Sequence, residues 1–243
     1  MLQLEIDVSQ FQGDIDWDRV GTDTYVRRVY VKGSDYFNGT RLADPQLVNN
    51  FRGVRKRSSF FSPMYVGYYH YFRTDTNGVK ITVDEQVDFI RERMAEVDFD
   101  PKKDVFAVDV ERTVGDPGIS GGPDRLSNLE CSSRLRALLL GVQATYKDKM
   151  RMVIYTQKSF WDPYCYSPEV DLNGIAKLWL TSPYSNQGAN LTATMADINK
   201  TQYWPDPVLG FEKVHIWQFS NRFQIEGFTG PVDTNLAPTF EGW

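Results

Sequence analysis

Strand-like and helix-like segments alternate along the first part of this 243-residue chain. Runs rich in β-branched and aromatic residues predict strands at 2–8, 25–33, 64–72, 105–111 and 151–156. Two capping boxes predict helix starts between them, one from Thr82 with Glu85 and one from Ser127 with Glu130. Alternation of this kind requires crossover connections and therefore a parallel sheet, either open and doubly wound or closed into a barrel.

The absence of a phosphate-binding motif favours the barrel. No GxGxxG or P-loop pattern follows a predicted strand, which removes the usual nucleotide-binding form of the open sheet. Beyond Trp161 three further strands are predicted at 176–182, 213–219 and Val232–Asp233, with little helical pattern between them. We therefore expect an α/β fold, an irregular TIM-like (β/α) barrel in one domain over residues 1–243. Helices would surround its first five strands, and mostly plain strands would close it.

One helix start and two irregular stretches complete the expected layout. Asp44 and Pro45 predict the N-cap and first residue of a helix that precedes the third strand. The stretches 112–125 and 183–210 read as long irregular connections, and loops of that length are often functional. The Gly/Pro-rich loop at 112–125 directly follows a predicted strand, so we expect it to form a wall of the functional cleft.

Composition excludes several classes of partner. The net charge of −5, without a block of Lys or Arg, argues against nucleic acid or an anionic membrane surface. No apolar run is long enough to span a bilayer, and we see no secretory signal. With only two histidines we expect neither a metal nor a cofactor, and we expect a monomer. Cys131 and Cys165 are expected to be buried small side chains, and the sequence leaves open whether they are bonded.

The segment Val105–Glu111 carries the most chemistry. On a strand, Asp109 and Glu111 share a face with Val105 and Ala107, and their Cα atoms lie roughly 6.6 Å apart. They stand at the C-terminal end of an apolar strand, where parallel barrels place catalytic groups. Two carboxylates there are costly to desolvate unless they are used or paired with Arg or Lys at the rim. We interpret them as a candidate acid pair.

Two further acids are candidates for the same site. Asp7 ends the first predicted strand, and Asp233 lies in the sequence Pro-Val-Asp-Thr-Asn near the C-terminus. Each has an ordinary structural explanation, a helix cap or loop acid for Asp7 and an Asx turn for Asp233. We also expect aromatic side chains at or just past strand ends to line a sugar cleft, although each ring alone is more typical of a core. These are Tyr69, Tyr155, Trp179, Tyr184 and Trp217. Lys32 and Arg73 either neutralise the acids or are solvated.

An ordered set of short motifs resembles glycoside hydrolase family 25, the lysozymes of Chalaropsis and phage-endolysin type. The chain carries Asp-Val-Ser-Gln-Phe-Gln-Gly-Asp-Ile-Asp-Trp at 7–17, Gly-Tyr-Tyr-His-Tyr-Phe-Arg at 67–73 and Asp-Val-Glu at 109–111. Ile-Tyr-Thr at 154–156, Leu-Trp-Leu at 178–180, Trp-Gln at 217–218 and Val-Asp-Thr-Asn at 232–235 follow in the family's order. A departure occurs at 32–36, where Lys-Gly-Ser-Asp-Tyr stands in place of the family's usual Lys-Ala-Thr-Glu-Gly.

The resemblance implies a muramidase, which hydrolyses the β-1,4 bond between N-acetylmuramic acid and N-acetylglucosamine in bacterial peptidoglycan. It implies Glu111 as general acid, with Asp109, Asp7 and Asp233 lining the same acidic pocket. Several carboxylates in one pocket raise one another's pKa, so that one can stay protonated near neutral pH. The expected setting is a phage-encoded lysin, released into the host cytoplasm and acting on the cell wall, or an enzyme carried by the virion.

Two other functions remain open at this point. A chitinase-like glycosidase also uses a D-x-E strand end, but the extended D-x-x-D-x-D-x-E run is missing, since residues 104–109 read Asp-Val-Phe-Ala-Val-Asp. A catalytically silent wall-binding or phage structural module is the alternative from another class. Retention of the four acids argues against it.

Overall fold

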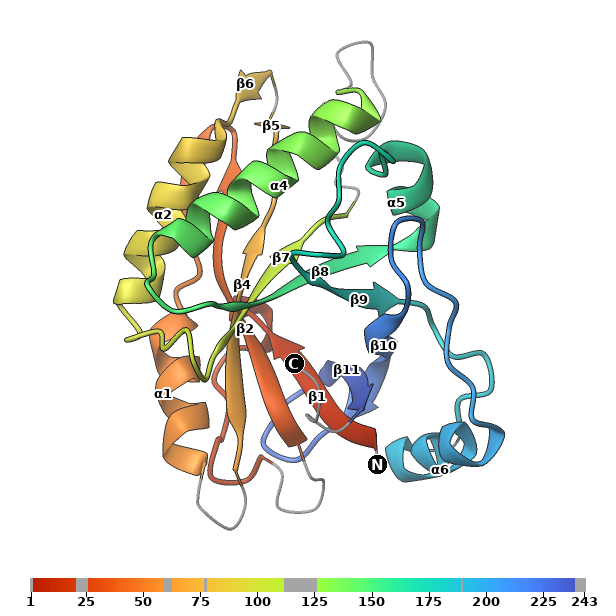
Figure 1. Ribbon diagram of the computed structural model, residues 1–243. Coiled ribbons are helices and arrows are strands. Elements are labelled where there is room, and N and C mark those ends of the chain that lie inside the picture. The colour runs from red at the N-terminus through yellow and green to blue at the C-terminus, as the bar shows by residue number, and fades with distance from the viewer. Residues whose placement is uncertain are drawn as a thin grey trace.

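The structure, a computed structural model, describes residues 2–20, 26–58, 63–76, 78–111, 126–188 and 190–238. Within these residues a nine-stranded sheet has the spatial order β1-β11-β10-β9-β8-β7-β4-β2-β3 (Figure 1). Its strands are β1 (Leu2–Val8), β2 (Val26–Phe37), β3 (Thr40–Ala43), β4 (Tyr65–Tyr71), β7 (Val105–Asp109), β8 (Arg151–Gln157), β9 (Lys177–Thr181), β10 (Val214–Gln224) and β11 (Pro231–Pro238). A separate small sheet pairs β5 (Asp75–Thr76) with β6 (Val79–Lys80).

The first strand closes the sheet into a barrel. β1 pairs in parallel with β2 on one side and antiparallel with β11 on the other. From β1 through β2, β4, β7, β8 and β9 to β10, neighbouring strands are parallel, whereas β11 runs antiparallel to β10 as well. β3 lies outside the ring, paired with the far end of β2. The expected irregular TIM-like α/β barrel is confirmed.

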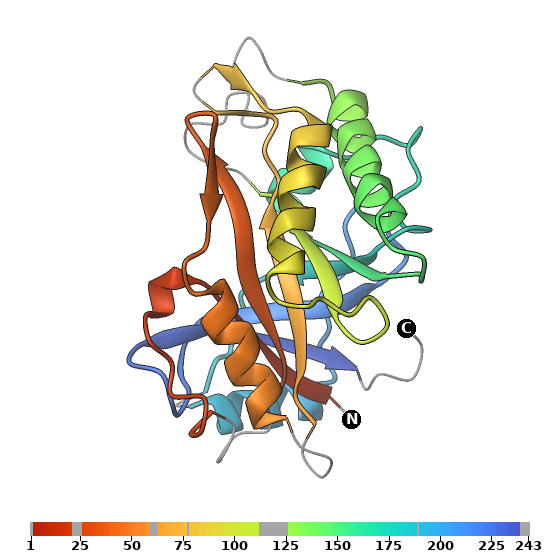
Figure 2. The ribbon, with the colours of Figure 1, turned by 90° about the vertical axis from the view of Figure 1, so that its left-hand side faces the viewer.

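Helices occupy the crossover connections that parallel strands require. They are α1 (Leu47–Arg57), α2 (Val83–Ala95), α4 (Asn128–Ala144), α5 (Lys158–Tyr164) and α6 (Leu191–Thr201). Both predicted capping boxes are present, at the starts of α2 and α4. Figures 1 and 2 show α1, α2 and α4 along one side of the barrel, with α6 apart from them. No helix of the described residues is long and apolar enough to cross a membrane.

Two local expectations are wrong. The helix near residue 44 begins at Leu47, because the Asp44 carboxylate accepts the backbone N–H groups of Gln46 and Gln10, both at 2.8 Å, and so caps a turn instead. The stretch 183–210, expected to be irregular, contains α6, whose start is capped where Asn190 Oδ1 accepts the Ala193 N–H at 2.9 Å. The predicted loop at 112–125 lies outside the described residues.

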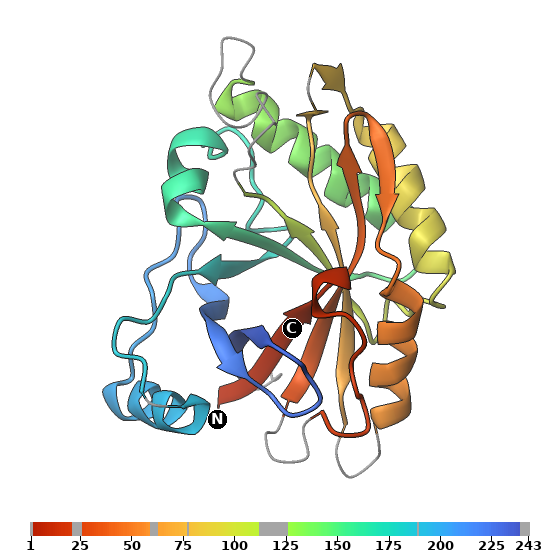
Figure 3. The same cartoon turned by 180° about the vertical axis from the view of Figure 1, so that it is seen from behind.

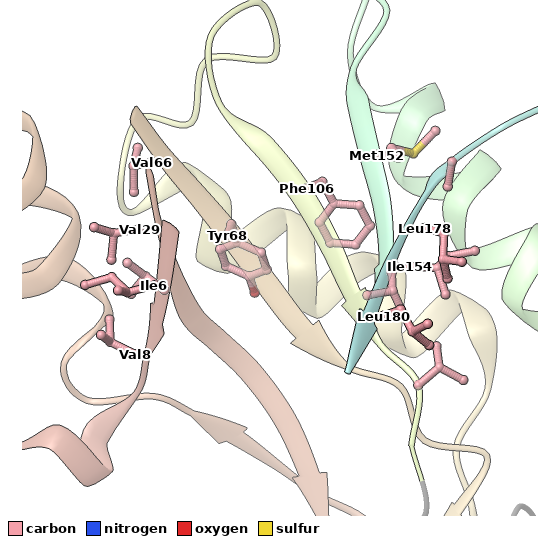
Figure 4. Packing of buried hydrophobic residues seen from close by; sticks show 14 of the residues in the cluster. Ile6, Val8, Val29, Val66, Tyr68, Phe106, Met152, Ile154, Leu178 and Leu180 are labelled. Atoms are coloured by element: carbon pink, nitrogen blue, oxygen red, sulfur yellow. The ribbon is translucent and has the colours of Figure 1, made fainter. Parts of the chain in front are cut away.

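The barrel wall separates two apolar regions. Side chains on the outer face, among them Ile6, Val29, Tyr68 and Phe106, belong to one large core that the helices cover (Figure 4). The inner face holds a smaller cluster of buried side chains, namely Tyr30, Val105, Ala107, Val153, Trp179, Ile216 and Ala237. Because side chains alternate along a strand, each strand contributes to both regions. The inner cluster forms the floor on which the candidate site rests.

A buried ion pair lies below this floor. Arg28 Nη1 is 3.4 Å from Glu5 Oε1 and 3.3 Å from Tyr30 Oη, and both charged side chains are completely buried. Burial raises the pKa of Glu5, and the Arg28 charge opposes that rise. A buried charge without a partner would be strongly destabilising, so the two strands β1 and β2 are tied together here. The Tyr30 ring lies against Trp179, with centroids 4.4 Å apart, which connects the pair to the floor of the site.

Candidate active site

Four carboxyl side chains meet where strands of the barrel end. Asp7 of β1 lies opposite Asp233 of β11, and Asp109 ends β7 between Tyr71 of β4 and Tyr155 of β8. Glu111 follows two residues after Asp109. All four acids line one cleft with a volume of about 450 Å³. The structure therefore brings together the four predicted acids, which come from three strands that are distant in the sequence.

Three of the five predicted aromatic side chains line the cleft. Tyr69, Tyr155 and Trp179 do so, together with Lys32. Tyr155 donates its hydroxyl to Gln218 Oε1 at 2.8 Å, and Trp179 Nε1 donates to Asn235 Oδ1 at 2.8 Å. The Trp179 ring is almost wholly buried. Trp179 thus forms a fixed part of the cleft floor, held at both its ring face and its indole N–H.

Tyr184 and Trp217 are not among the residues that line the cleft. Trp217 is fully buried on the outer face of β10, where Nε1 donates to Ser182 O at 2.7 Å. Tyr184 packs against it, with centroids 5.7 Å apart, and donates its hydroxyl to Asp197 at 2.6 Å. The neighbouring residue Gln218 lines the cleft. The expectation failed because position near a strand end does not reveal which face of the strand a side chain occupies.

Asp7 and Asp233 form a hydrogen-bonded acid pair. Asp7 Oδ2 accepts Asn235 Nδ2 at 2.9 Å and Gln218 Nε2 at 3.2 Å. Burial raises the pKa of Asp7 well above its usual range, and the nearby Asp233 charge raises it further. Burial also raises the pKa of Asp233, which its hydrogen bond with Asp7 partly offsets. Two carboxyls this close hold a proton more tightly than either would alone.

The pKa values of Asp109 and Glu111 are raised as well. Burial is the main cause for Asp109, and the Glu111 charge adds to it. Asp109 Oδ1 is buried and has no hydrogen-bond partner within the described chain. Burial raises the pKa of Glu111, whereas Lys32 and Arg73 lower it. Lys32 and Arg73 thus both act on Glu111, Lys32 also lowers the pKa of Asp109, and Asp109 Oδ1 is an unused acceptor.

Lys32 and Arg73 meet at Asp35 on the rim of the cleft. Lys32 Nζ is 3.0 Å from Asp35 Oδ2, and Arg73 Nε is 2.9 Å from Asp35 Oδ1. Burial by itself would raise the pKa of Asp35, but hydrogen bonds and charges from Arg73 and Lys32 outweigh it and lower the pKa. Arg73 also lies 4.0 Å from the Tyr71 ring centroid. The two cations are thus held by an ion pair and also act on Glu111.

Several cleft residues were not among the predicted site residues. Asp35 stands where the family pattern usually has glutamate, so the departure at 32–36 was the signal for it. Gln218 follows Trp217 in a quoted motif. Adjacent residues of a strand point to opposite faces, so only one of the two can face the cleft, and this alternation was the signal for Gln218. Phe11, Leu42 and Ala43 also line the cleft. No cluster of His, Cys, Asp or Glu in the described residues is suited to hold a metal ion.

The raised pKa of Asp109 predicts a pH-dependent cost to stability. The folded protein binds more protons than the unfolded chain between roughly pH 4, the ordinary carboxyl value, and the folded pKa. The stability that protonated Asp109 contributes is therefore complete below about pH 4, the unfolded value, and is lost as pH rises through the folded pKa. We expect the melting temperature of Asp109→Asn to exceed that of the wild type at pH 8 and to converge with it near pH 4.

Thermal unfolding followed by circular dichroism across this pH range checks the prediction. Asp206→Asn, which changes an exposed aspartate outside the cleft, serves as the control and should follow the wild type at every pH. Parallel curves for Asp109→Asn and wild type would contradict the assigned pKa direction.

Comparison with known proteins agrees with this geometry. The sequence matches the family described as Glycosyl hydrolases family 25 over residues 6–228, a range that contains three of the four acids and ends before Asp233. No curated protein sequence matches the chain.

Solved structures share the fold at low sequence identity. The bacterial lysozyme from Streptomyces coelicolor is 21% identical, with coverage of 96% of this chain and 90% of that chain and a TM-score of 0.66. The muramidase from Acremonium alcalophilum is 14% identical, with coverage of 97% and 93% and a TM-score of 0.68. The catalytic domain of endolysin ply40 from bacteriophage P40 of Listeria monocytogenes is 15% identical, with coverage of 98% and 94% and a TM-score of 0.66. Since the family match spans most of the sequence and the barrel places acids at its strand ends, this chain belongs to glycosyl hydrolases family 25.

Proposed function

We propose that this glycoside hydrolase is a muramidase, which cleaves the β-1,4 bond between N-acetylmuramic acid and N-acetylglucosamine in bacterial peptidoglycan. The observation that carries the proposal is the convergence of Asp7, Asp109, Glu111 and Asp233 on one cleft. Structures named as a lysozyme and a muramidase share the fold, which supports the substrate class. One phage endolysin among them supports a phage-encoded lysin as the biological setting.

Glu111 is the proposed proton donor to the glycosidic oxygen. Its side chain is partly exposed in the cleft, and burial raises its pKa, so it holds a proton at higher pH than an ordinary glutamate. Lys32 and Arg73 limit that rise. A general acid works best when its pKa lies near the working pH, because it must be protonated and still release its proton. Burial and the two cations shift the pKa of Glu111 in opposite directions, and this balance supports its proposed role as general acid.

Asp109 is the proposed partner of the substrate's acetamido group. A glycosidase that retains configuration needs a nucleophile on the face opposite the acid. Asp109 and Glu111 lie two residues apart on one strand end, which suits an acid next to an orienting group. Asp109 lines the cleft, and its carboxylate would accept an acetamido N–H there, so that the acetamido oxygen could attack the anomeric carbon. Asp7 and Asp233 would tune the charge of the pocket.

Glu111→Gln is expected to lower activity by at least about 100-fold, the usual contribution of a general acid. The amide keeps the shape of the side chain but has no proton to donate. The measurement is the initial rate of muropeptide release from purified cell walls, with products identified by mass spectrometry. Glu212→Gln, an exposed change outside the cleft, should keep wild-type activity.

Product chemistry tests the proposed function directly. Wild-type enzyme should release fragments with reducing muramic acid ends. Reducing glucosamine ends would show a different glycosidase, and an absence of fragments would point to a silent wall-binding module. Near-normal lysis by Glu111→Gln would remove Glu111 from its role without affecting the substrate assignment.

The stereochemistry of the first product separates two mechanisms. Participation of the acetamido group predicts retention, so the β-anomer should appear first and then mutarotate. A proton NMR time course on peptidoglycan fragments at high enzyme concentration measures this order. If the α-anomer forms first, water attacks directly, and Asp7 or Asp233 takes the part of the activating base.

A further inference from the structure

Phe11 is the most exposed large apolar side chain in the described residues. Its side chain is 83% exposed, whereas the next most exposed one, Phe37, is 57% exposed. Phe11 lies in the short 3-10 turn η1 (Gln10–Gln12), which directly follows β1. A phenyl ring left in water forgoes the free energy that burial would provide. Exposure of one ring is ordinary by itself, so its place in the molecule decides what it means.

Hydrogen bonds hold the turn that presents this ring. Ser9 N donates to Gln12 Oε1 at 2.8 Å, and Ser9 Oγ accepts the Phe11 N–H at 3.3 Å. Gln10 N donates to Asp44 Oδ2 at 2.8 Å, which ties the turn to the chain that follows β3. The backbone that carries the ring is thus anchored on both sides of Phe11.

The displayed ring belongs to the cleft of the four acids. The residues from Asp7 to Gln12 line that cleft without interruption, so Phe11 lies four positions beyond an acid at the strand end. Leu42 of β3, which is 44% exposed, lines the cleft as well. Figure 3 shows η1 at the end of β1, beside the connection that leaves β3. The cleft therefore continues from the carboxylates to an apolar rim.

We propose that Phe11 is a stacking platform for a pyranose ring of the glycan strand, at a subsite beyond the two sugars that flank the cleaved bond. This rests on the proposed muramidase function. The C–H face of a pyranose is apolar and flat, and it packs on an aromatic ring while its hydroxyl edge stays in water. The flanking Gln10 and Gln12 side chains supply amide groups of the kind that meet a polar sugar edge.

The test compares KM and kcat on peptide-free glycan strands, long and short, prepared with an amidase. Phe11→Ala should raise KM on strands of eight or more sugars by about tenfold with kcat unchanged, and should leave disaccharide-length substrates unaffected. Phe11→Trp should restore the wild-type KM. Phe37→Ala is the matched control, because Phe37 is exposed but does not line the cleft, and it should change nothing.

Each other outcome has a defined meaning. An unchanged KM for Phe11→Ala on long peptide-free strands overturns the platform. A defect confined to strands that keep their stem peptides also overturns it, because the ring would then contact peptide. Failure of the wild type to cleave any strand would instead overturn the proposed function, so the two can be told apart.

Independently of the cleft, the two cysteines of the chain meet in the core. Cys131 is in the first turn of α4 and Cys165 is the C-cap residue that follows α5, and their Sγ atoms are 2.9 Å apart. Both thiols are buried. Ser132 Oγ donates to the Cys165 carbonyl, which fixes the two helices against each other at this point. An S–S bond of about 2.05 Å requires a further approach of less than about 1 Å.

We infer that Cys131 and Cys165 form a disulfide when the protein meets an oxidising environment. A suitable oxidant is a low-molecular-weight disulfide such as oxidised glutathione. One protein thiolate attacks it and releases one reduced glutathione, and the second protein thiol then displaces the other. Two protons and two electrons pass from the protein to two glutathione molecules. The bond would enclose β8, which pairs with the catalytic strand β7 and carries Tyr155 into the cleft.

The test is made in a urea concentration at the foot of the unfolding transition, so that buried thiols can exchange. The protein is first equilibrated with oxidised glutathione and is then fully denatured and treated with an alkylating agent. It should take up none, and its monomer mass should be 2 Da below that of the reduced form. The oxidised protein should melt roughly 5–15 °C above the reduced form. Cys131→Ala and Cys165→Ala should show no such difference. Two alkylated thiols, glutathione adducts or a linked dimer would overturn the inference.

Discussion

The antiparallel strand β11 is the constraint on which the site depends. It lies between β10 and β1, and its register places Asp233 opposite Asp7 and Asn235 opposite Gln218. Because the chain ends of the barrel are joined in this way, an acid from the first strand and one from the last become neighbours. Asn235 then contacts both Asp7 and the Trp179 indole, so one side chain supports the acid pair and the cleft floor.

Charge balance in the cleft follows from this closure. Four acids at strand ends would repel one another strongly if all were ionised, and burial raises the pKa of each. Lys32 and Arg73 line the same cleft, held by Asp35, and both lower the pKa of Glu111, while Lys32 also lowers that of Asp109. The four acids are therefore not equivalent, because the cations act on Glu111, the proposed donor, and are not among the causes of the raised pKa values of Asp7 and Asp233.

The longest strand of the barrel shapes the open side of the cleft. β2 runs on past Lys32 to Phe37 and pairs there with β3, in the segment where the sequence departs from the family pattern. Asp35 and Leu42 are opposite each other in this pairing, and both line the cleft. An aspartate in place of the usual glutamate still reaches both cations. Asp35 forms ion pairs with both Lys32 and Arg73. The pairing of β2 with β3 brings Leu42 to the cleft that Phe11 also lines.

The sequence by itself determined the barrel class, the main strands and the capped starts of α2 and α4, because periodicity and capping are local properties. It also placed Asp109 and Glu111 together, since one strand end carries both. Only the tertiary structure decided that Asp7 and Asp233 share a hydrogen bond and that Trp217 faces outward while Gln218 faces the cleft. Register between distant strands and the face that each side chain occupies depend on pairing, and a shift by one residue reverses every side chain of a strand.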